Sequence, residues 1–302
     1  MLRTMSSLAE EVVDAIHALT GEHPGHRTAH AKGTLMTGTF TPNGSGLTTA
    51  AHMQETPSRV TVRFSNGGGE PAIPDYAQEG RGIAVKFYAP DGEKTDIVGL
   101  TLPCFFVRTP EDFLSFTRAR KDPEKLMPDW FAAHPEALPA IQAHLGSQPP
   151  ASYATAAYNS IHSFRWIDAD GGSRFVRYRF EPEAGEHALA PDDAKALGRD
   201  YLQEEIVARG ESAFRLVVVI ADESDPVDDP TVEWPAERER VEVGRLVVTG
   251  PDTERERDGD ILVFDPTRVI DGIELSDDQI LRFRSDAYRV SVTRRAGPAP
   301  GG

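Results

Sequence analysis

The stretch RVTVRFSNGGGEPAIPDYAQEGRGIAVKFYA, residues 59–89, places two runs of β-branched and aromatic residues on either side of a segment rich in Gly, Pro and Asp. Runs of this composition predict strands, and the punctuation between them predicts a turn or loop. With about seven or eight strands, a hairpin turn at DADGGS (168–173) and no alternation of strands with helices, the sequence predicts a closed antiparallel β-barrel. The other strand-like runs are at residues 34–40, 162–168, 174–182, 214–222 and 241–249.

Helices are expected to flank this barrel, which makes the fold class α+β. Apolar residues at helical spacing predict an amphipathic helix over residues 6–20. Capping residues and acidic first turns predict the others, with Ser276 as the expected cap of the last one. We expect a single domain over residues 1–296, with 1–20 as an N-terminal helical arm, and a flexible tail at 297–302. The further predicted helices are residues 109–122, 128–146, 190–210 and 277–295.

Composition limits the possible partners. The 302 residues carry a formal net charge of −16, and this much negative charge repels nucleic acid and anionic lipid. The N-terminus lacks an apolar stretch of signal-peptide length, and no segment has the roughly 20 apolar residues that cross a bilayer. The one cysteine, Cys104, excludes an intrachain disulfide and is expected to be a small buried residue. We expect a cytoplasmic protein with no nucleic-acid or membrane partner.

Arg284, Tyr288 and Arg295 share one face of the last predicted helix, since they are spaced by four and then seven residues. A guanidinium held against a phenol oxygen favours the phenolate, and a phenolate can bind ferric iron. Arg295 can reach an anionic group further along the face. Taken alone, the same pattern is also that of a solvated helix face with one packed tyrosine.

The segment GHRTAHAKGTL, residues 25–35, supplies a complementary set of groups. A neutral His30 can take a proton from the inner oxygen of a peroxide and return it to the outer oxygen, whereas Arg27 can pair with a carboxylate. Arg63 and Ser65 lie on the same face of a strand, so Ser65 can hydrogen-bond an imidazole and orient it. The alternatives are polar loop histidines and a surface charge at Arg63.

Several of these stretches, in order and approximate spacing, resemble the haem catalases between about residue 20 and residue 296. The matching blocks are RTAHAKG (27–33), VRFSNGGGE (62–70), GRGIAVKFYAPDGEKTDIVGLTLPCFFVRTPEDF (80–113), YLQEE (201–205), VEVGRLVV (241–248), LVFDPTRVIDGIELSDDQIL (262–281) and RSDAYRVSVTRR (284–295). The resemblance implies a catalase-type closed antiparallel β-barrel with flanking helices. It also implies haem b, ferric protoporphyrin IX, between the barrel and the C-terminal proximal helix.

The resemblance also implies roles for single residues. His30 is similar to the distal catalytic histidine, and Ser65 to the hydroxyl that bonds it. Tyr288 is similar to the proximal phenolate that ligates the iron, with Arg284 as its charge partner. The remaining positions that resemble haem-binding residues are the three propionate arginines Arg27, Arg63 and Arg295 and the aromatic residues Phe106 and Phe113.

Two departures from the family pattern stand out. Catalases usually read VGNN.P.FF where this chain reads VGLTLPCFF, so Thr101 is interpreted as standing in place of the distal asparagine. A hydroxyl has fewer donors than an amide, and we expect peroxide dismutation to suffer first. From the length of this sequence we expect the long N-terminal arm and the C-terminal helical domain of ordinary catalases to be absent, which resembles the minimal catalase-related peroxidases.

The sequence therefore predicts a haem peroxidase that reduces hydrogen peroxide or organic hydroperoxides with a small organic electron donor. In this interpretation His30 assists heterolysis of the O–O bond on tyrosinate-ligated ferric haem. The alternatives are a true catalase, a hydroperoxide isomerase of the allene oxide synthase type, and a non-enzymatic haem-binding protein. A homodimer is one expected assembly, and no nucleotide-binding fingerprint indicates an NADPH site.

Overall fold

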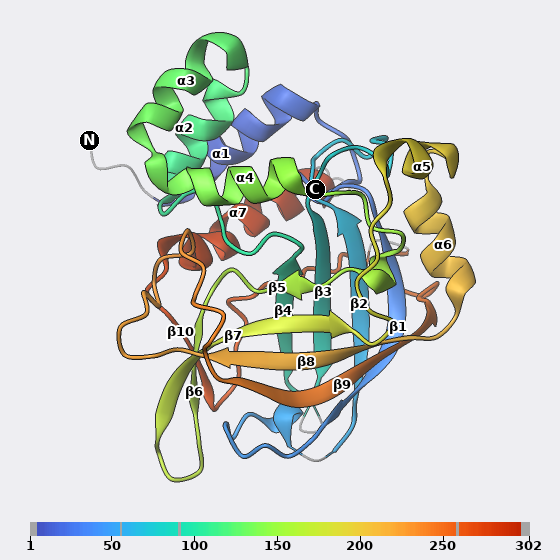
Figure 1. Ribbon diagram of the computed structural model, residues 1–302, viewed down its shortest axis with the longest axis vertical. Coiled ribbons are helices and arrows are strands. Elements are labelled where there is room, and N and C mark those ends of the chain that lie inside the picture. The colour runs from blue at the N-terminus through green and yellow to red at the C-terminus, as the bar shows by residue number, and fades with distance from the viewer. Residues whose placement is uncertain (1–4, 55, 90–91, 258–259, 297–302) are drawn as a thin grey trace, which may run out of the picture.

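A closed antiparallel β-barrel of eight strands forms the centre of the computed structural model (Figure 1), which describes residues 5–54, 56–89, 92–257 and 260–296. The strands follow one another around the barrel in the order β7-β5-β4-β3-β2-β1-β9-β8, and β7 pairs with β8 to close it. Two short strands, β6 and β10, extend the sheet beside β7. The bounds are β1 Gly33–Pro42, β2 Ser58–Asn66, β3 Arg81–Tyr88, β4 Lys94–Leu100, β5 Tyr158–Asn159, β6 Phe164–Ile167, β7 Ser173–Pro182, β8 Ser212–Ile220, β9 Arg240–Pro251 and β10 Ile273–Leu275.

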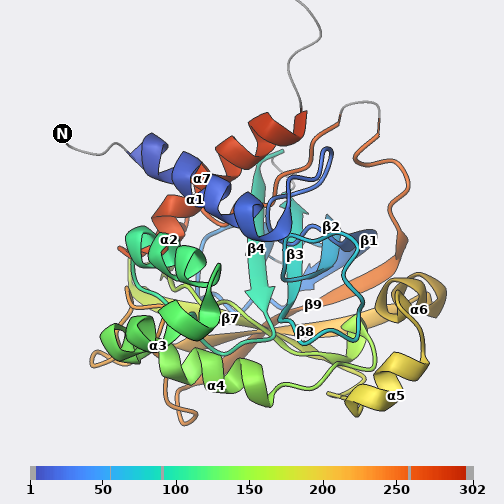
Figure 2. The ribbon, with the colours of Figure 1, turned by 90° about the horizontal axis from the view of Figure 1, so that it is seen from above.

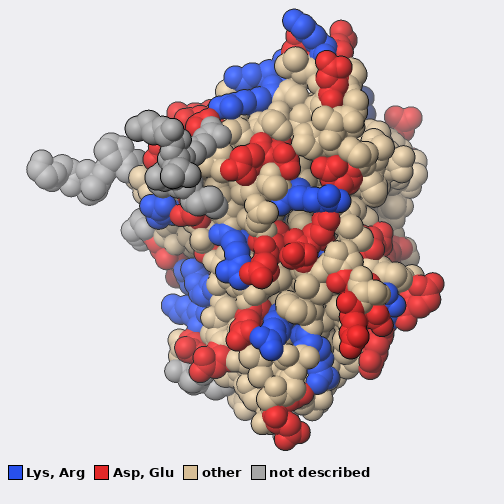
Figure 3. All heavy atoms as spheres, turned by 90° about the vertical axis from the view of Figure 1, so that its left-hand side faces the viewer, with Lys and Arg blue, Asp and Glu red and all other residues tan. Residues whose placement is uncertain are grey.

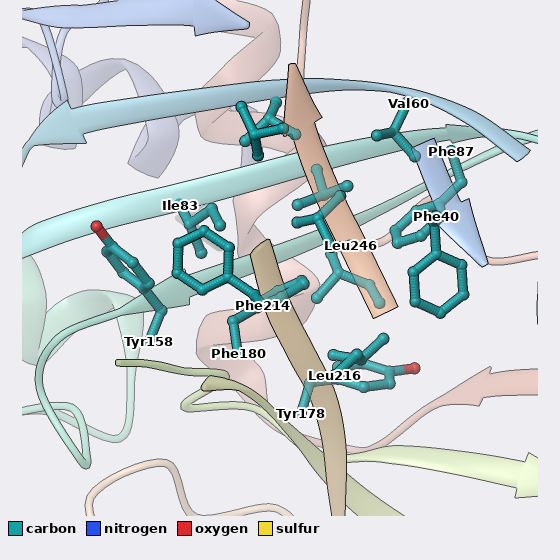
Figure 4. Close-up of a cluster of buried hydrophobic side chains, with 14 of the residues drawn as sticks. Phe40, Val60, Ile83, Phe87, Tyr158, Tyr178, Phe180, Phe214, Leu216 and Leu246 are labelled. Atoms are coloured by element: carbon teal, nitrogen blue, oxygen red, sulfur yellow. The ribbon is translucent and has the colours of Figure 1, made fainter. Parts of the chain in front are cut away.

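The barrel interior is apolar because alternate residues of each strand point inward. Phe64 on β2 faces Ile83 on β3, and both are buried. Figure 4 shows Ile83, Phe214 and Leu246 converging from three different strands onto this core. The expected antiparallel barrel is confirmed. Because the apolar residues fill the interior, the functional side chains carried by these strands are those on the outward face.

The hairpin predicted at residues 168–173 joins β6 to β7. The Asp168 carboxylate accepts a hydrogen bond from Gly172 N at 2.8 Å, and Gly171 adopts a positive φ of 82°. Only glycine takes that conformation at little cost, so the Asp-Gly-Gly order selects the turn.

The helices lie outside the barrel, as expected. The predicted helix 6–20 is α1, and the predicted helix 277–295 is α7, whose hydrogen-bonded turns begin two residues later. The other bounds are α2 Pro110–Ala119, α3 Pro123–Ala133, α4 Leu138–Gly146, α5 Pro191–Ala196 and α6 Tyr201–Arg209; α1 spans Met5–Thr20 and α7 spans Gln279–Ala296.

Two of the predicted helices are wrong in length because each is interrupted. The stretch 128–146 is divided at Pro135, which disfavours a helical backbone at the preceding His134; the observed dihedrals there are φ −126° and ψ 65°. The stretch 190–210 is divided at Gly198, whose φ of 107° no helix accommodates. The expected single domain over 1–296 stays a prediction, and residues 1–4 and the tail at 297–302 lie outside the described residues.

Helix α7 packs mainly against α1 and α2, at the end of the barrel where α1 and α7 lie side by side (Figures 1 and 2). Acidic and basic side chains are interspersed on the face drawn in Figure 3. Cys104 is buried, and burial raises the pKa of its thiol to about 11, which confirms the expectation of a small core residue. Within the described residues, no helix is long and apolar enough to cross a membrane.

Candidate functional site

A chain of four polar side chains begins at the tyrosine of α7. Arg284 Nη1 donates to Tyr288 Oη at 2.9 Å, as the spacing of four residues predicts. Arg284 Nε lies 2.8 Å from His162 Nε2, and His162 Nδ1 lies 2.6 Å from Asp278 Oδ2. Burial, with a smaller contribution from Arg284, lowers the pKa of His162 to about 4, so this imidazole is neutral at physiological pH. A neutral imidazole that donates from Nδ1 to Asp278 accepts at Nε2, which leaves the positive charge on Arg284 beside the phenol.

Asp278 also fixes where α7 starts. Its Oδ1 accepts from Ile280 N at 2.8 Å and from Leu281 N at 3.1 Å, as an N-cap does. The expected cap, Ser276, is wrong: its buried Oγ has no hydrogen-bond partner among the described residues. One carboxylate therefore caps the helix through one oxygen and holds His162 through the other.

His30 lies against the outward face of the barrel. Its Nδ1 is 3.0 Å from Ser65 Oγ, and its backbone adopts a left-handed φ of 54°. Burial, together with the nearby charges of Arg63 and Arg284, lowers the pKa of the imidazole to about 3. The ring is therefore neutral across the physiological range. His30 Nε2 has no hydrogen-bond partner among the described residues.

The strand register decides which residues accompany this imidazole. Ser65 pairs with Gly82, and Gly82 pairs with Leu100, so these three positions form one row on the same face. Thr101 lies beyond the row: its Oγ accepts from Arg81 N at 3.0 Å at the end of the β3–β4 ladder. The structure thus brings Leu100, rather than the predicted Thr101, into register beneath His30.

Two of the three predicted arginines contact one carboxylate that sequence reasoning missed, and the third, Arg63, lies near it. Arg27 Nη2 lies 2.5 Å from Glu256 Oε1, and Arg295 Nη1 lies 3.4 Å from the same oxygen. Both arginines also donate to the carbonyl of Leu262. Arg63 is buried rather than on the surface; its burial, with the charge of Arg27, lowers its pKa to about 9. Arg27 and Arg295 therefore share one neighbouring anion, Glu256, and the charge of that carboxylate also acts on Arg63.

A polar cavity of about 420 Å³ opens beside this cluster. Arg27, Arg63 and Glu256 line one part of it, and Lys32, Asp200 and Gln203 line another. Lys32 Nζ lies 2.5 Å from Asp200 Oδ1, so the positive charge of Lys32 is balanced by a carboxylate. The surplus positive charge of the cavity lies at the arginines.

Phe106 and Phe113, the predicted aromatic positions, are half-buried and lie with their ring centroids 5.7 Å apart. Phe113 packs against the cluster that joins α1 to Phe283 of α7, and Phe106 belongs to the neighbouring cluster that contains Ile280. The aromatic pair therefore lies beside the helix that carries Tyr288.

The residues present fit a haem. A half-buried phenol with a guanidinium on its oxygen is the donor set for ferric iron, and the unused Nε2 of His30 belongs to a neutral imidazole. Arg27, Arg63 and Arg295 gather near one carboxylate, Glu256, so these cations outnumber their acidic partner and can bind propionates. Half-buried Ala84, Val98 and Leu100 provide an apolar wall on β3 and β4.

No single motif in the sequence gave His162, Asp278 or Glu256 a role. Asp278 was recognised only as one of two acidic residues in the first turn of the last helix, and His162 opened a predicted strand. His162 and Asp278 are 116 positions apart in sequence, and Glu256 and Arg295 are 39 positions apart. Only the folded chain brings these groups into contact.

Comparison with known proteins places this geometry in a family. The chain is 43% identical to a catalase-related peroxidase of Mycolicibacterium paratuberculosis, with 95% of both chains covered, and 30% identical to a catalase-related peroxidase of Synechococcus elongatus, with 95% of this chain and 88% of the relative covered. A fungal catalase crystal structure superposes with a TM-score of 0.81 at 25% identity, covering 95% of this chain and 63% of the other. The Catalase family model matches residues 8–299. This chain belongs to the catalase family.

Proposed function

We propose that this protein is a haem-dependent peroxidase that reduces hydrogen peroxide or organic hydroperoxides with a small organic electron donor. The observation that carries the proposal is that one chain provides both a neutral His30 oriented by Ser65 and the Tyr288–Arg284 contact on α7. Two relatives, matched over 95% and 88% of their own lengths, are described as catalase-related peroxidases. The catalase family implies haem, and haem b is the form we propose.

The chain's own residues would hold the cofactor at its iron and at its propionates. Tyr288 would ligate the iron, and Arg27, Arg63 and Arg295 would bind the propionates. When bound, the haem would supply the redox chemistry of peroxide reduction by a one-electron donor.

His30 moves the proton in this scheme. For Nε2 to act as a base, Nδ1 carries the hydrogen and donates it to Ser65 Oγ, 3.0 Å away. Nε2 then takes the proton from the inner peroxide oxygen and returns it to the outer oxygen, so that water or an alcohol leaves as the O–O bond breaks. A pKa of about 3 keeps this nitrogen free to accept the proton at neutral pH.

Arg284 holds positive charge at the phenol oxygen. Asp278 fixes His162, His162 accepts from Arg284 Nε, and Arg284 Nη1 remains aimed at Tyr288 Oη. A phenol oxygen that ligates ferric iron carries negative charge, and the Arg284 guanidinium lies 2.9 Å from the oxygen that would take that role.

The deciding experiment is an absorption spectrum of the purified protein before and after peroxide, with oxygen release followed alongside. The proposal expects a Soret band, a peroxide-dependent change that a phenolic donor reverses, and little oxygen. Tyr288→Phe should change the ferric spectrum, and an unchanged spectrum in that variant would contradict the ligand assignment.

Product analysis separates the remaining alternatives. Rapid oxygen release indicates a catalase, and rearrangement of a fatty-acid hydroperoxide without donor consumption indicates an isomerase. A haem band that does not respond to peroxide indicates a carrier.

A further inference from the structure

One cross-strand row lies under the His30 imidazole. Antiparallel partners present their side chains on the same face, so Ser65, Gly82 and Leu100 project together from β2, β3 and β4. A Cβ on Gly82 would stand 2.9 Å from His30 Cε1 and 3.0 Å from Ser65 Oγ, which identifies this face as the one that the imidazole covers. Leu100 is the third member of the row and is half-buried.

The opposite face confirms the direction of the row. Gly99, one residue earlier, would place a Cβ 3.1 Å from Tyr158 Cβ and 3.3 Å from Ile83 Cγ2, both in the barrel core. Because side chains alternate along a strand, Leu100 points away from that core. Its half-buried side chain therefore belongs to the wall of the site.

The row gives the site one polar side chain and one hydrocarbon side chain. Ser65 Oγ is engaged with His30 Nδ1, and Leu100 has no hydrogen-bonding atom in its side chain. The neighbouring hydroxyl, Thr101 Oγ, accepts from Arg81 N within the ladder. A peroxide at His30 Nε2 thus has the imidazole for proton exchange and an apolar neighbour contributed by the row.

We propose that Leu100 is a specificity-determining residue that favours organic hydroperoxides over hydrogen peroxide and suppresses dismutation. The inference rests on the peroxidase function proposed above. Peroxidase turnover is ROOH + 2 DH → ROH + H2O + 2 D•, in which one O–O bond breaks and two donor molecules (DH) supply two electrons and two protons. Dismutation is 2 H2O2 → O2 + 2 H2O, in which a second hydrogen peroxide supplies them instead.

The two reactions differ in what they require of position 100. Hydrogen peroxide has no apolar surface, so only hydrogen bonds hold and orient it, and removing one preorganised donor from a reacting oxygen typically costs about 10²- to 10³-fold in rate. An alkyl or aryl hydroperoxide buries its hydrocarbon group against Leu100, which favours its binding. The side chain therefore selects against the smaller substrate and for the larger one.

Leu100→Asn tests this directly. The amide restores a donor in the same row, so oxygen release per hydrogen peroxide consumed should rise at least about tenfold. The kcat/KM for cumene hydroperoxide should fall. A third readout needs no turnover: the affinity of the ferric protein for cyanide, titrated in the Soret region, should increase several-fold as the amide donates to the anion.

Thr101→Val is the matched control, because its hydroxyl lies in the ladder; oxygen release should match the wild type. Leu100→Gln serves as the second variant if the asparagine variant does not fold. Unchanged oxygen release and cyanide affinity in a haem-loaded Leu100 amide variant would overturn the inference while leaving the peroxidase proposal intact. An increase in oxygen release caused by Thr101→Val alone would also overturn it. A wild-type protein that lacks peroxidase activity would remove the proposed function, and this inference with it.

Discussion

His30 reaches its position through a backbone conformation that a residue other than glycine rarely adopts. A left-handed φ costs such a residue on the order of 1 kcal/mol or more, so the surrounding structure must hold it there. His30 N donates to Gly67 O at 3.2 Å and Ala31 N donates to Gly68 O at 3.0 Å, which anchors the segment on both sides of the strained residue. The strain places the imidazole directly on Gly82, where any larger residue would collide with it.

Replacing His30 should remove the proton transfer and little else. His30→Ala is expected to slow the reaction with peroxide by about 10² to 10⁴, the usual contribution of a general acid-base group. His26→Ala is the matched control, because His26 is exposed in the same segment. Stopped-flow spectra of the two haem-loaded variants measure the effect, and equal rates would contradict the role given to His30.

The half-buried imidazole of His30 and the buried imidazole of His162 make stability depend on pH. The unfolded chain protonates histidine near pH 6.5, whereas the folded chain holds the pKa of His30 to about 3 and of His162 to about 4. Because the unfolded state binds protons first, the haem-free protein loses stability as the pH falls below 6.5, by up to about 2 kcal/mol per histidine at pH 5. Urea unfolding at pH 7 and pH 5 measures the loss, and His30→Ala should lose about 2 kcal/mol less between these values.

At the scale of elements, helix α7 carries the tyrosine and its start is set by Asp278. The cap bonds from Ile280 N and Leu281 N fix the first turn, and the His162 contact ties that turn to the segment between β5 and β6. The direction of the Tyr288 side chain therefore depends on a carboxylate ten residues earlier.

Asp278→Ala should lower the free energy of unfolding by about 1 to 3 kcal/mol, because it removes a cap and leaves a buried imidazole without its acceptor. Asp278→Asn keeps a capping oxygen and should cost less. Asp277→Ala is the control, since the Asp277 side chain is 88% exposed. Urea denaturation of the three variants ranks them, and an equal loss in Asp277→Ala would contradict the capping role.

At the scale of the whole molecule, the arginine cluster of the site is assembled from both ends of the chain. Arg27 follows α1, Arg295 ends α7, and Glu256 lies in the segment after β9 with a left-handed φ of 58°. Arg27 and Glu256 are 229 positions apart in sequence. Closure of the barrel and packing of α1 against α7 bring them together.

Glu256 occupies the arginines that propionates would bind, so the two carboxylates compete. Glu256→Gln should raise haem affinity by about tenfold, the effect expected when one charge-assisted competitor is weakened. Glu254→Gln is the control, because the Glu254 side chain is 84% exposed. Haem titration in the Soret region measures both, and equal affinities would show that Glu256 does not compete.

The sequence alone determined the features that depend on neighbours along the chain. Strand composition and turn residues predicted the barrel, and a spacing of four residues predicted the Arg284–Tyr288 contact, because local backbone geometry fixes both. Multi-block resemblance identified the family. The helix interruptions at Pro135 and Gly198 were missed, although both residues disfavour a continuous helix.

Only the tertiary structure decided which residues meet across the site. Whether position 100 or 101 faces His30 depends on the register of β3 against β4, and a shift of one residue exchanges the two faces. The contacts of His162 with Asp278 and of Glu256 with the arginines join segments far apart in sequence, and no local pattern encodes such a distance. Backbone periodicity is a property of the chain, whereas proximity in the site is a property of the closed barrel and the helices packed on it.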